Sequence, residues 1–306
     1  MIEKYETLVI YHADCLDGLG AAWSAFCKLG EHARYIPARH GDEFPAFEPG
    51  TTIYILDFSY SPEQLLMAAK QAGQIILIDH HITAMEQCEA FFYKNCSGEL
   101  FASKPCAVLS ASEAKPQPLP ENLSLYFDMK RSGCVLAWQY FFPELQPPTI
   151  LLHIEDRDLW LFKLAGTREI TSALYERMPM TLPEMGAIDL DELLEIGRIY
   201  VDFQQKIVKR LAKIAHPISL NGQKGLAVNA PSSFSSELGH VLAEKSGTFG
   251  LTYQYDGRKQ KWQFSLRSIG DYDVGHLAQA FGGGGHKNAA GFVLDDNPFI
   301  AGKVVE

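Results

Sequence analysis

The sequence lacks the features that mark a disulfide-stapled, secreted or membrane-spanning protein. Six cysteines are scattered over the first 134 residues, and none forms a C-x-x-C pair. Counting alone would allow a disulfide framework, but a chain of 306 residues, 47% of them apolar, can build a core without one, which favours reduced thiols. No apolar run approaches the ~18 residues of a membrane span, and the N-terminus carries charges rather than a secretory signal. We therefore expect a cytoplasmic protein with no membrane partner.

Basic residues are also scarce. The chain has 27 lysines and arginines against 37 acidic residues, a net charge of −10 and a pI near 5.5. A long duplex nucleic acid is therefore not expected as a partner, because it would require a basic face. A short anionic substrate stays compatible with this charge, since bound cations can reverse the sign of a site locally.

The first half of the chain alternates short apolar runs with helical spacing. The apolar runs lie at residues 7–11, 52–56 and 75–78, and helical segments follow at 18–29 and 62–72. This alternation predicts parallel strands joined by crossover helices. The expected fold class is α/β, with a doubly wound, mostly parallel sheet.

The pattern changes after residue 188. Within residues 189–216, apolar side chains recur every three or four positions with charges between them, which predicts one long amphipathic helix that stops before Pro217. The remainder, 217–306, has strand-like runs and predicts a smaller α+β domain. The expected organisation is a first domain at 1–188, a connecting helix at 189–216 and a second domain at 217–306.

Acidic residues and histidines follow each of the three apolar runs. Because the carboxyl ends of parallel strands lie at one edge of a sheet, these side chains are expected to converge there. Each one alone could be a turn cap or a hydrogen-bonded histidine, but carboxylates and imidazoles together suit divalent cations such as manganese, magnesium or zinc, and their number allows two ions. The residues are His12, Asp14, Asp17, Asp57, Asp79, His80 and His81.

The second domain contains a glycine-rich segment that ends in a histidine. Four glycines in succession let backbone N–H groups approach a phosphate, although a flexible turn is the structural alternative. His286 adds a donor, and Arg267 suits bidentate phosphate binding. Ser132 in the first domain is either a smaller substrate contact or a helix cap. The glycines are Gly282, Gly283, Gly284 and Gly285.

Taken together, these motifs resemble the DHH phosphoesterase superfamily. Asp79-His80-His81 lies between the upstream acidic motifs and the Gly-Gly-Gly-Gly-His segment, in the family's order, and the resemblance covers most of the chain. The C-terminal part resembles the DHH-associated domain. The resemblance implies that the first domain is a catalytic metal-binding domain and the last a substrate-binding domain, closing around a short anionic substrate.

The resemblance also implies a role for each residue. His12 and Asp14 would hold one metal ion, Asp17 and His80 the other, and Asp57 would bridge both. Asp79 would orient a ligand histidine, and His81 would face the substrate phosphate or the bridging solvent. The implied ions are two manganese ions, with magnesium or cobalt as alternatives.

Two positions in this assignment stay open. Many members have His-x-Asp-x-Asp where this chain has His-x-Asp-x-x-Asp, and a subset has Asn at the place of Asp14, so Asp17 is the better-founded ligand. The family's fourth motif supplies one more aspartate. Asp158 is preferred because it shortly precedes an aromatic residue, and Asp156 is the alternative.

The implied activity is that of a manganese-dependent phosphoesterase. It would hydrolyse phosphodiester or phosphomonoester bonds of short oligonucleotides or nucleotides with a two-metal-activated hydroxide, as in nano-RNases and oligoribonuclease-like members. The alternatives are an exopolyphosphatase-like or pyrophosphatase-like phosphoanhydride hydrolase, and a non-catalytic nucleotide-binding sensor. Homodimer formation is left open.

Overall fold

The first of two compact units is built on a five-stranded, all-parallel sheet. A computed structural model describes residues 5–94, 100–102 and 119–299, and the chain divides into the units Met1–Arg198 and Ile199–Glu306. The first sheet has the strand order β2-β1-β3-β4-β7. Its strands are β1 (Thr7–His12), β2 (Ala33–Ala38), β3 (Thr52–Leu56), β4 (Gln74–Asp79) and β7 (Leu123–Phe127).

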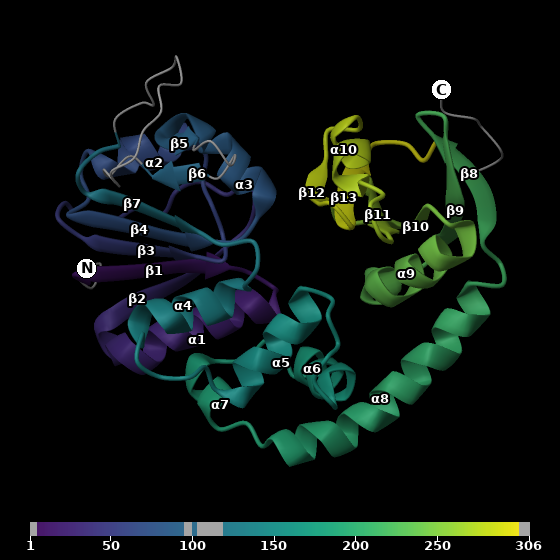
Figure 1. The fold of residues 1–306 in the computed structure, drawn as a ribbon, viewed down its shortest axis with the longest axis horizontal. Helices are drawn as coiled ribbons and strands as arrows, with labels where there is room; N and C mark the ends of the chain where they lie inside the picture. Colours follow the sequence, from purple (N-terminus) through teal and green to yellow (C-terminus); the bar gives the residue numbers. More distant parts are fainter. Residues whose placement is uncertain (1–4, 95–99, 103–118, 300–306) are drawn as a thin grey trace. The chain divides into compact units, whose positions relative to one another are not determined.

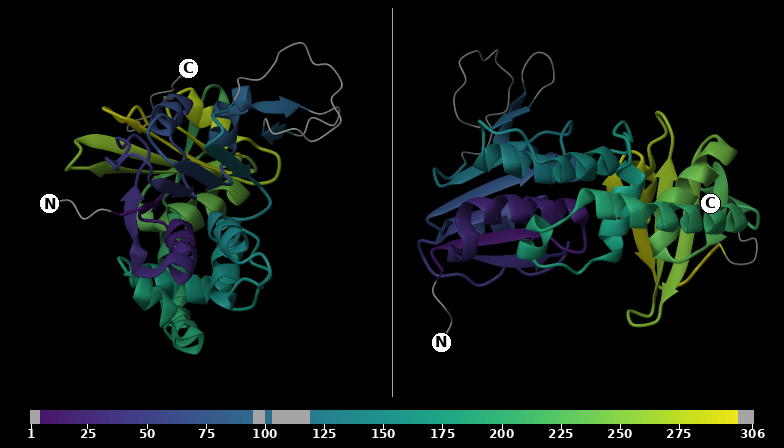
Figure 2. Two further views of the ribbon diagram at one scale, coloured as in Figure 1. Left: turned by 90° about the vertical axis from the view of Figure 1, so that its left-hand side faces the viewer. Right: turned by 90° about the horizontal axis from the view of Figure 1, so that it is seen from below.

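Helices cover both faces of this sheet, which confirms the doubly wound α/β class (Figures 1 and 2). On one face, α1 (Leu16–Leu29) and α4 (Gly133–Phe141) pack against each other and against the strands. On the other face lies α2 (Pro62–Ala69), which begins with a capping box. The Ser61 side chain accepts from the Gln64 N–H, and the Gln64 side chain accepts from the Ser61 N–H.

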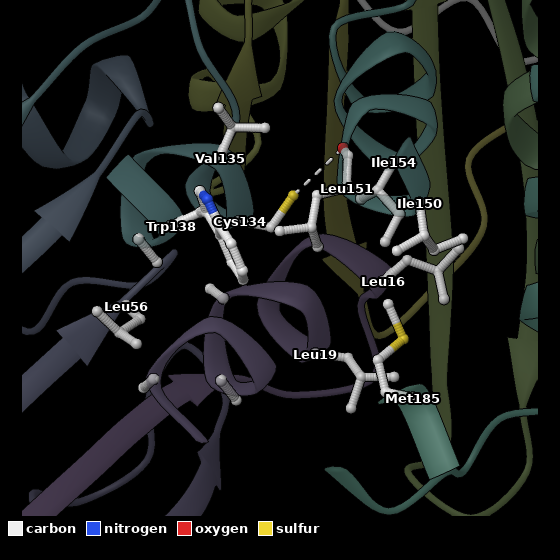
Figure 3. Packing of buried hydrophobic residues seen from close by; sticks show 14 of the residues in the cluster. Leu16, Leu19, Leu56, Cys134, Val135, Trp138, Ile150, Leu151, Ile154 and Met185 are labelled. Atoms are coloured by element: carbon white, nitrogen blue, oxygen red, sulfur yellow. Dashed lines mark hydrogen bonds between the residues drawn. The ribbon is translucent and has the colours of Figure 1, made fainter. Parts of the chain in front are cut away.

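The helix layer of α1 and α4 has a close-packed core (Figure 3). Leu16 and Leu151 are buried there, and the Cys134 Sγ lies 3.7 Å from the carbonyl oxygen of Leu151. The two helices can approach closely because Gly20 has no side chain. A Cβ at this position would lie only 2.8 Å from the Cβ of Cys134. This packing fixes the first turn of α1, from which Asp17 projects.

The rest of the first unit is mainly helical. The long helix α8 was predicted from its apolar period, and its early position Leu193 is fully buried, whereas Ile199 is 71% exposed and Phe203 60% exposed. The period therefore predicted the helix correctly but not the burial of the whole apolar stripe. The helix α8 (Leu190–Leu211) begins in the first unit and ends in the second, since the units divide after Arg198. The other elements are α3 (Ile82–Gln87), β5 (Phe92–Lys94), β6 (Leu100–Ala102), α5 (Thr149–Asp158), α6 (Thr167–Glu176) and α7 (Leu182–Gly186).

The second unit is α+β, as expected. Its six-stranded sheet has the order β12-β13-β11-β10-β9-β8 and is antiparallel except for the pair β9–β10. Four residues connect β10 to β11, which pair as an antiparallel hairpin. The elements are β8 (His216–Leu220), β9 (Gln223–Asn229), α9 (Ser235–Ser246), β10 (Phe249–Asp256), β11 (Lys261–Ser268), α10 (Val274–Gln279), β12 (Gly284–His286) and β13 (Ala289–Leu294).

The cysteines that the structure describes are not bonded to one another. Cys15, Cys27, Cys88 and Cys134 are free thiols, whereas the other two cysteines lie outside the described residues. Within the described part of the chain, none of the helices is long and apolar enough to cross a membrane.

Candidate metal centre

The carboxyl ends of three neighbouring strands bring predicted ligands to one edge of the first sheet. His12 is the last residue of β1, Asp57 follows β3 directly, and Asp79 ends β4. The Asp57 N–H donates to the carbonyl oxygen of Ile78 at 2.9 Å, which holds the ends of β3 and β4 level. The convergence follows from the parallel topology.

His80 lies among three carboxylates. Its Nε2 is 3.2 Å from an oxygen of Asp57, 3.5 Å from Asp17 and 3.6 Å from Asp158. The side chains of His80, Asp17 and Asp57 are at most 3% exposed, whereas that of Asp158 is 28% exposed. We call Asp17, Asp57, His80 and Asp158 the carboxylate-rich group.

Helix α4 supports this group from behind. The carboxylate of Asp17 accepts hydrogen bonds from the N–H groups of Gly133 (2.6 Å) and Cys134 (2.9 Å), at the first turn of α4. A Cβ on Gly133 would lie 2.5 Å from the Asp57 Oδ1, so this approach requires glycine. Sequence reasoning gave Gly133 no such role, because nothing in the pattern distinguishes it from any other helix start.

A second group lies beside the first and shares Asp57 with it. The Nδ1 of His12 is 3.6 Å from the Asp57 Oδ2, and the rings of His12 and His81 are 5.9 Å apart between centres. His12, Asp57 and His81 each offer one ligand atom within 4.8 Å of the others. We call these three residues the imidazole-rich group. Because Asp57 belongs to both groups, its two oxygens can serve two cations.

Asp79 orients His81. Its Oδ1 accepts hydrogen bonds from the His80 N–H (2.7 Å), the His81 N–H (3.2 Å) and the His81 Nδ1 (2.6 Å), while its Oδ2 accepts from the Ser59 hydroxyl (2.6 Å). Burial alone would lower the pKa of His81, but the Asp79 carboxylate raises this pKa to about 9. Because the Nδ1 of His81 contacts Asp79, the Nε2 on the opposite side of the ring points away from Asp79. The raised pKa means that the ring can carry a proton at neutral pH.

The crowding of charge shifts the pKa values in both directions. Burial alone would raise the pKa of Asp57, but the adjacent imidazoles, above all His12 and His80, hold it well below its usual range. Burial also raises the pKa of Asp17, and the carboxylates of Asp57 and Asp158 raise it further. For His80, burial lowers the pKa, but the carboxylates outweigh this effect and bring the value to about 10.

The unsatisfied atoms of the centre fit divalent cations. The His12 Nδ1 and both carboxylate oxygens of Asp57 are buried and have no hydrogen-bond partner among the residues that the structure describes. An unpaired buried polar group costs about 1–3 kcal/mol, and buried carboxylates repel one another. A cation in each group would satisfy these atoms and offset the repulsion. Oxygen ligands with one or two imidazoles suit manganese, magnesium and similar ions.

The structure does not bring Asp14 to this centre. Its Oδ2 accepts hydrogen bonds from Nε (2.9 Å) and Nη2 (2.6 Å) of Arg39, and its side chain is 73% exposed. Asp14 also has a left-handed backbone with φ of 56°, which turns its side chain out of the line of β1. Within the described residues, the candidate metal groups of the first unit do not include it.

Asp156 bonds to the loop that follows α5, whereas Asp158 lies beside His80. Its carboxylate accepts hydrogen bonds from the N–H groups of Lys163 (2.8 Å) and Leu164 (3.0 Å) and from the Thr167 hydroxyl (2.6 Å). It therefore closes the loop after α5, while Asp158 at the end of α5 joins the carboxylate-rich group. This geometry favours Asp158 as the fourth-motif residue.

Ser132 is fully buried at the start of α4. Its hydroxyl lies 3.3 Å from the Cys134 Sγ, its N–H donates to Glu155, and its side chain makes no capping hydrogen bond. Neither of the two roles considered for Ser132, a substrate contact or a side-chain cap, matches this position.

In the second unit, the glycine-rich segment forms strand β12 and the turn before it. A Cβ on Gly283 would lie 2.1 Å from the carbonyl oxygen of Gly291, and one on Gly285 would lie 2.5 Å from that of Ala289, so these two glycines allow close pairing with β13. A Cβ on Gly284 would meet nothing within 4 Å. A Cβ on Gly282 would also meet nothing, but its φ of 75° favours glycine, so Gly284 is the one of the four with neither a packing nor a backbone reason to be glycine.

Arg267 lies on β11 in the same unit. Its Nη1 donates to the carbonyl oxygen of Leu266 and its Nη2 to the hydroxyl of Ser236, both at 2.8 Å. The guanidinium is thus oriented by its own strand and by α9. His286 is the last residue of β12 and is partly exposed.

Comparisons with known proteins agree with this architecture. Residues 235–304 match the DHHA1 domain family. The chain is 29% identical to an uncharacterized protein of Acanthamoeba polyphaga mimivirus over 94% of its own length and 67% of that protein.

Two solved structures share the fold. An exopolyphosphatase-related protein from Bacteroides fragilis has a TM-score of 0.52 at 16% identity, over 96% of this chain and 88% of that one. RecJ from Thermus thermophilus, in complex with Mn²⁺, has a TM-score of 0.50 at 14% identity, over 96% of this chain and 50% of that one.

The fold and the strand-end centre define an α/β protein with a candidate metal centre at the carboxyl edge of its parallel sheet. The match of residues 235–304 to the DHHA1 domain, together with the shared fold, supports the resemblance to the DHH phosphoesterase superfamily with this C-terminal domain.

Proposed function

We propose that this chain is a metal-dependent phosphoesterase that hydrolyses short oligonucleotides or nucleotides. The observation that carries the proposal is the buried Asp57, whose two unsatisfied oxygens face His12 on one side and His80 on the other. In this proposal residues 1–188 form the catalytic domain, 189–216 the connecting helix and 217–306 the substrate-binding domain. The RecJ structure with Mn²⁺ supports manganese as the cation, with magnesium or cobalt as alternatives.

Two cations held here would make a water nucleophilic at neutral pH and offset charge on the phosphoryl oxygens. Asp17, His80 and Asp158 would hold one cation and His12 the other, with Asp57 shared. The protein's own contribution to the chemistry lies in His81. Asp79 fixes its ring, and its Nε2 would donate a proton to a phosphoryl oxygen or to the leaving oxygen of the bound substrate.

The second unit would bind the remaining phosphates. Gly284, whose Cβ position is open, would let a phosphate approach the β12 backbone, and His286 and Arg267 would donate to it. The variants Gly284→Ala and Gly283→Ala distinguish an effect on phosphate binding from an effect on folding. Gly284→Ala should keep the parent melting temperature and raise KM, whereas Gly283→Ala should lower the melting temperature. An unchanged KM in Gly284→Ala would contradict the phosphate site.

The substrate class follows from charge. Net charge −10 argues against a long strand and suits a short anion. A second candidate, phosphoanhydride hydrolysis, is favoured by the likeness to the exopolyphosphatase-related protein. A non-catalytic nucleotide-binding sensor would bind nucleotides without turnover. Homodimer formation stays a prediction.

One experiment tests activity and substrate together. The full chain is incubated with Mn²⁺ and, separately, with a dinucleotide, a nucleotide 3′,5′-bisphosphate, a cyclic dinucleotide and polyphosphate. We expect release of mononucleotide from the dinucleotide and its loss in Asp57→Asn, with the exposed Asp191→Asn as a matched control. Phosphate release from polyphosphate alone would establish the second candidate, and tight nucleotide binding without turnover would establish the sensor.

A further inference from the structure

Aromatic rings lie next to the carboxylate-rich group along the chain. Trp160 comes two residues after Asp158, whose carboxylate lies 3.6 Å from the Nε2 of His80. Consecutive Cα atoms are about 3.8 Å apart, so the Cα of Trp160 lies within about 7.6 Å of the Cα of Asp158. The ring of Phe162 packs against the indole with 4.9 Å between the ring centres. A phosphate bound at the metal centre would therefore lie one short loop away from these rings.

Two arginines flank the rings. On α5, the Cζ of Arg157 lies 5.9 Å from the ring centre of Trp160 and 5.3 Å from that of Tyr175. On α6, the Cζ of Arg168 lies 5.7 Å from the Trp160 centre and 3.5 Å from the Phe162 centre. In a chain of net charge −10, two cations thus gather beside a group of three carboxylates. We call Trp160, Phe162, Tyr175, Arg157 and Arg168 the aromatic–arginine cluster.

The rings of this cluster do not belong to a closed core. Trp160 and Phe162 are partly exposed, and Tyr175 is exposed, as is Leu161 between the first two. Phenylalanines that only fill a core of this chain, such as Phe58, are almost completely buried. Single exposed apolar side chains are common on proteins, but several on one surface are typical of a binding site.

The backbone that carries the rings is strained. Trp160 and Phe162 have φ of 56° and 48°, in the left-handed region that bulky residues rarely adopt. Hydrogen bonds hold them there: the Trp160 N–H donates to the Arg157 carbonyl oxygen (2.9 Å), and the Phe162 N–H donates to that of Asp156 (3.2 Å). Asparagine or glycine would fit both positions with less strain, so the loop presents aromatic rings at a cost to its own stability. Such strain is concentrated at ligand-binding sites in proteins.

We propose that Trp160 stacks against the base of a nucleotide whose phosphate lies at the metal centre, with Arg157 and Arg168 beside that base. The inference rests on the proposed function and deepens it, because it makes the base a recognised part of the substrate. Stacking on an aromatic ring tolerates any base, since every base has a flat face. The cluster would therefore select nucleotides over phosphate compounds that have no base.

The ring distances assign the stacking to Trp160 rather than to Phe162. Carbon atoms in van der Waals contact lie about 3.5–4.0 Å apart. The Cζ of Arg168 is this close to the Phe162 centre, at 3.5 Å, so the guanidinium covers one face of that ring. Neither guanidinium, at 5.7 and 5.9 Å, is in such contact with the middle of the indole. Phe162 therefore supports Arg168, and the indole is the ring on which a base would stack, with guanidinium donors near the acceptor atoms of the base.

The test measures binding as well as turnover, on the full chain with Mn²⁺. Calorimetry compares adenosine 5′-monophosphate with ribose 5-phosphate, which has the same phosphate and sugar but no base. Hydrolysis of a dinucleotide gives KM and kcat.

The variants remove or keep a flat ring at one position. Trp160→Asn removes the ring and suits the left-handed backbone, whereas Trp160→Phe keeps a smaller ring. The matched control is Tyr255→Asn, which removes an exposed aromatic residue of the second unit, near the end of β10. Circular dichroism checks folding, and Trp160→Leu replaces Trp160→Asn if the latter is unfolded.

We expect the parent and Tyr255→Asn to bind the nucleotide about 5–150-fold more tightly than ribose 5-phosphate, which is the range for one base stack. Trp160→Asn should lose this preference, keep its affinity for ribose 5-phosphate and raise KM for the dinucleotide with little change in kcat. Trp160→Phe should keep most of the preference.

Two results would overturn the inference and leave the proposed function standing. They are hydrolysis of the dinucleotide by a parent that binds both ligands equally, and a preference in Trp160→Asn as large as that of the parent. A parent that prefers the nucleotide through Trp160 but hydrolyses none of the phosphate substrates would overturn the proposed function and leave the base site standing.

Discussion

The two groups that share Asp57 differ in depth and in donor chemistry. In the carboxylate-rich group, Asp17 and His80 are at most 3% exposed, and only Asp158, at 28%, reaches the rim. In the imidazole-rich group, the side chains of both histidines, His12 and His81, are partly exposed, at 24% and 18%. The carboxylate-rich group, the deep group, concentrates negative charge that needs a cation to be stable, and the imidazole-rich group, the outer group, offers imidazole nitrogens near solvent. One sheet edge thus provides one site suited to holding an ion firmly and one suited to exchanging ligands with a substrate.

Removing the shared carboxylate should abolish the difference between the groups. Asp57→Asn is expected to lower kcat with Mn²⁺ by more than about 100-fold, because outer contacts to a metal ligand already contribute 10–100-fold. When the metal-free protein is titrated with Co²⁺, cation binding to both groups should weaken together. Parental kcat, or the loss of only one ion, would show that Asp57 is not shared. Asp191→Asn controls for the charge change.

A cation bound in the deep group should raise the free energy of unfolding more than a cation bound in the outer group. Mn²⁺ at about 100 times its dissociation constant should raise the free energy of unfolding by about 2.7 kcal/mol, which EDTA should reverse. Asp17→Asn should lose most of this gain, because it removes a buried ligand, whereas His12→Gln should keep more of it. Thermal unfolding with and without Mn²⁺ measures both. Equal losses in the two variants would mean that the groups do not differ in cation affinity.

Orientation of His81 is a property of the outer group alone. Asp79→Asn removes the carboxylate that accepts from the His81 Nδ1, and kcat is expected to fall about 10–100-fold. The Mn²⁺ affinity of the carboxylate-rich group should stay within about threefold of the parent. Ser59→Ala, which removes only the hydroxyl on the other oxygen of Asp79, should cost much less. A Ser59→Ala defect as large as that of Asp79→Asn would point to a general packing effect.

Asp156, two residues before Asp158 of the deep group, holds the loop after α5. Burial alone would raise its pKa, but the Thr167 hydroxyl and the loop N–H groups outweigh this and lower it. A depressed folded-state pKa stabilises the protein above the ordinary carboxyl pKa of about 4, and this contribution is lost as the pH falls through the folded value. Asp156→Asn should therefore lower the free energy of unfolding by about 1–3 kcal/mol at pH 7, and by less at pH 3. Urea unfolding at both pH values measures this, and a loss that is independent of pH would contradict it.

The strand-end residues of both groups could be predicted from the sequence, for a physical reason. The central strands are continuous apolar runs, so their ends, and the residues that follow them, are visible in the pattern. The edge strand β2 contains Pro37 and exposed Arg34, as edge strands do, and so the run does not stand out. The segment after this edge strand, which contains Arg39, could therefore not be placed beside the centre from the pattern.

Tertiary contacts account for the rest of what the sequence left open. The spacing His-x-Asp-x-x-Asp shows that Asp14 and Asp17 are both near the end of β1, but not which one turns inward. That depends on the Arg39 guanidinium, 25 residues further along the chain, and on the N–H groups at the start of α4 that bind Asp17. Contacts of this kind between distant segments have no signature in local spacing.

The smallest expected effect is that of the surface pair Asp14–Arg39. It distinguishes Asp14 as an ion-pair partner of Arg39 from Asp14 as a metal ligand. As half of an exposed ion pair, Asp14 should couple to Arg39 by about 0.2–1 kcal/mol in a double-mutant cycle of Asp14→Asn and Arg39→Gln, measured by urea unfolding. Both single variants should then leave Co²⁺ binding in the imidazole-rich group within about threefold of the parent, because neither side chain contacts the ion. If Asp14 were itself a ligand, Asp14→Asn would weaken binding at least about tenfold, whereas Arg39→Gln would free the carboxylate and leave binding intact or strengthen it. The size of the Asp14→Asn effect thus shows whether Asp14 is a surface partner of Arg39 or a ligand of the outer group.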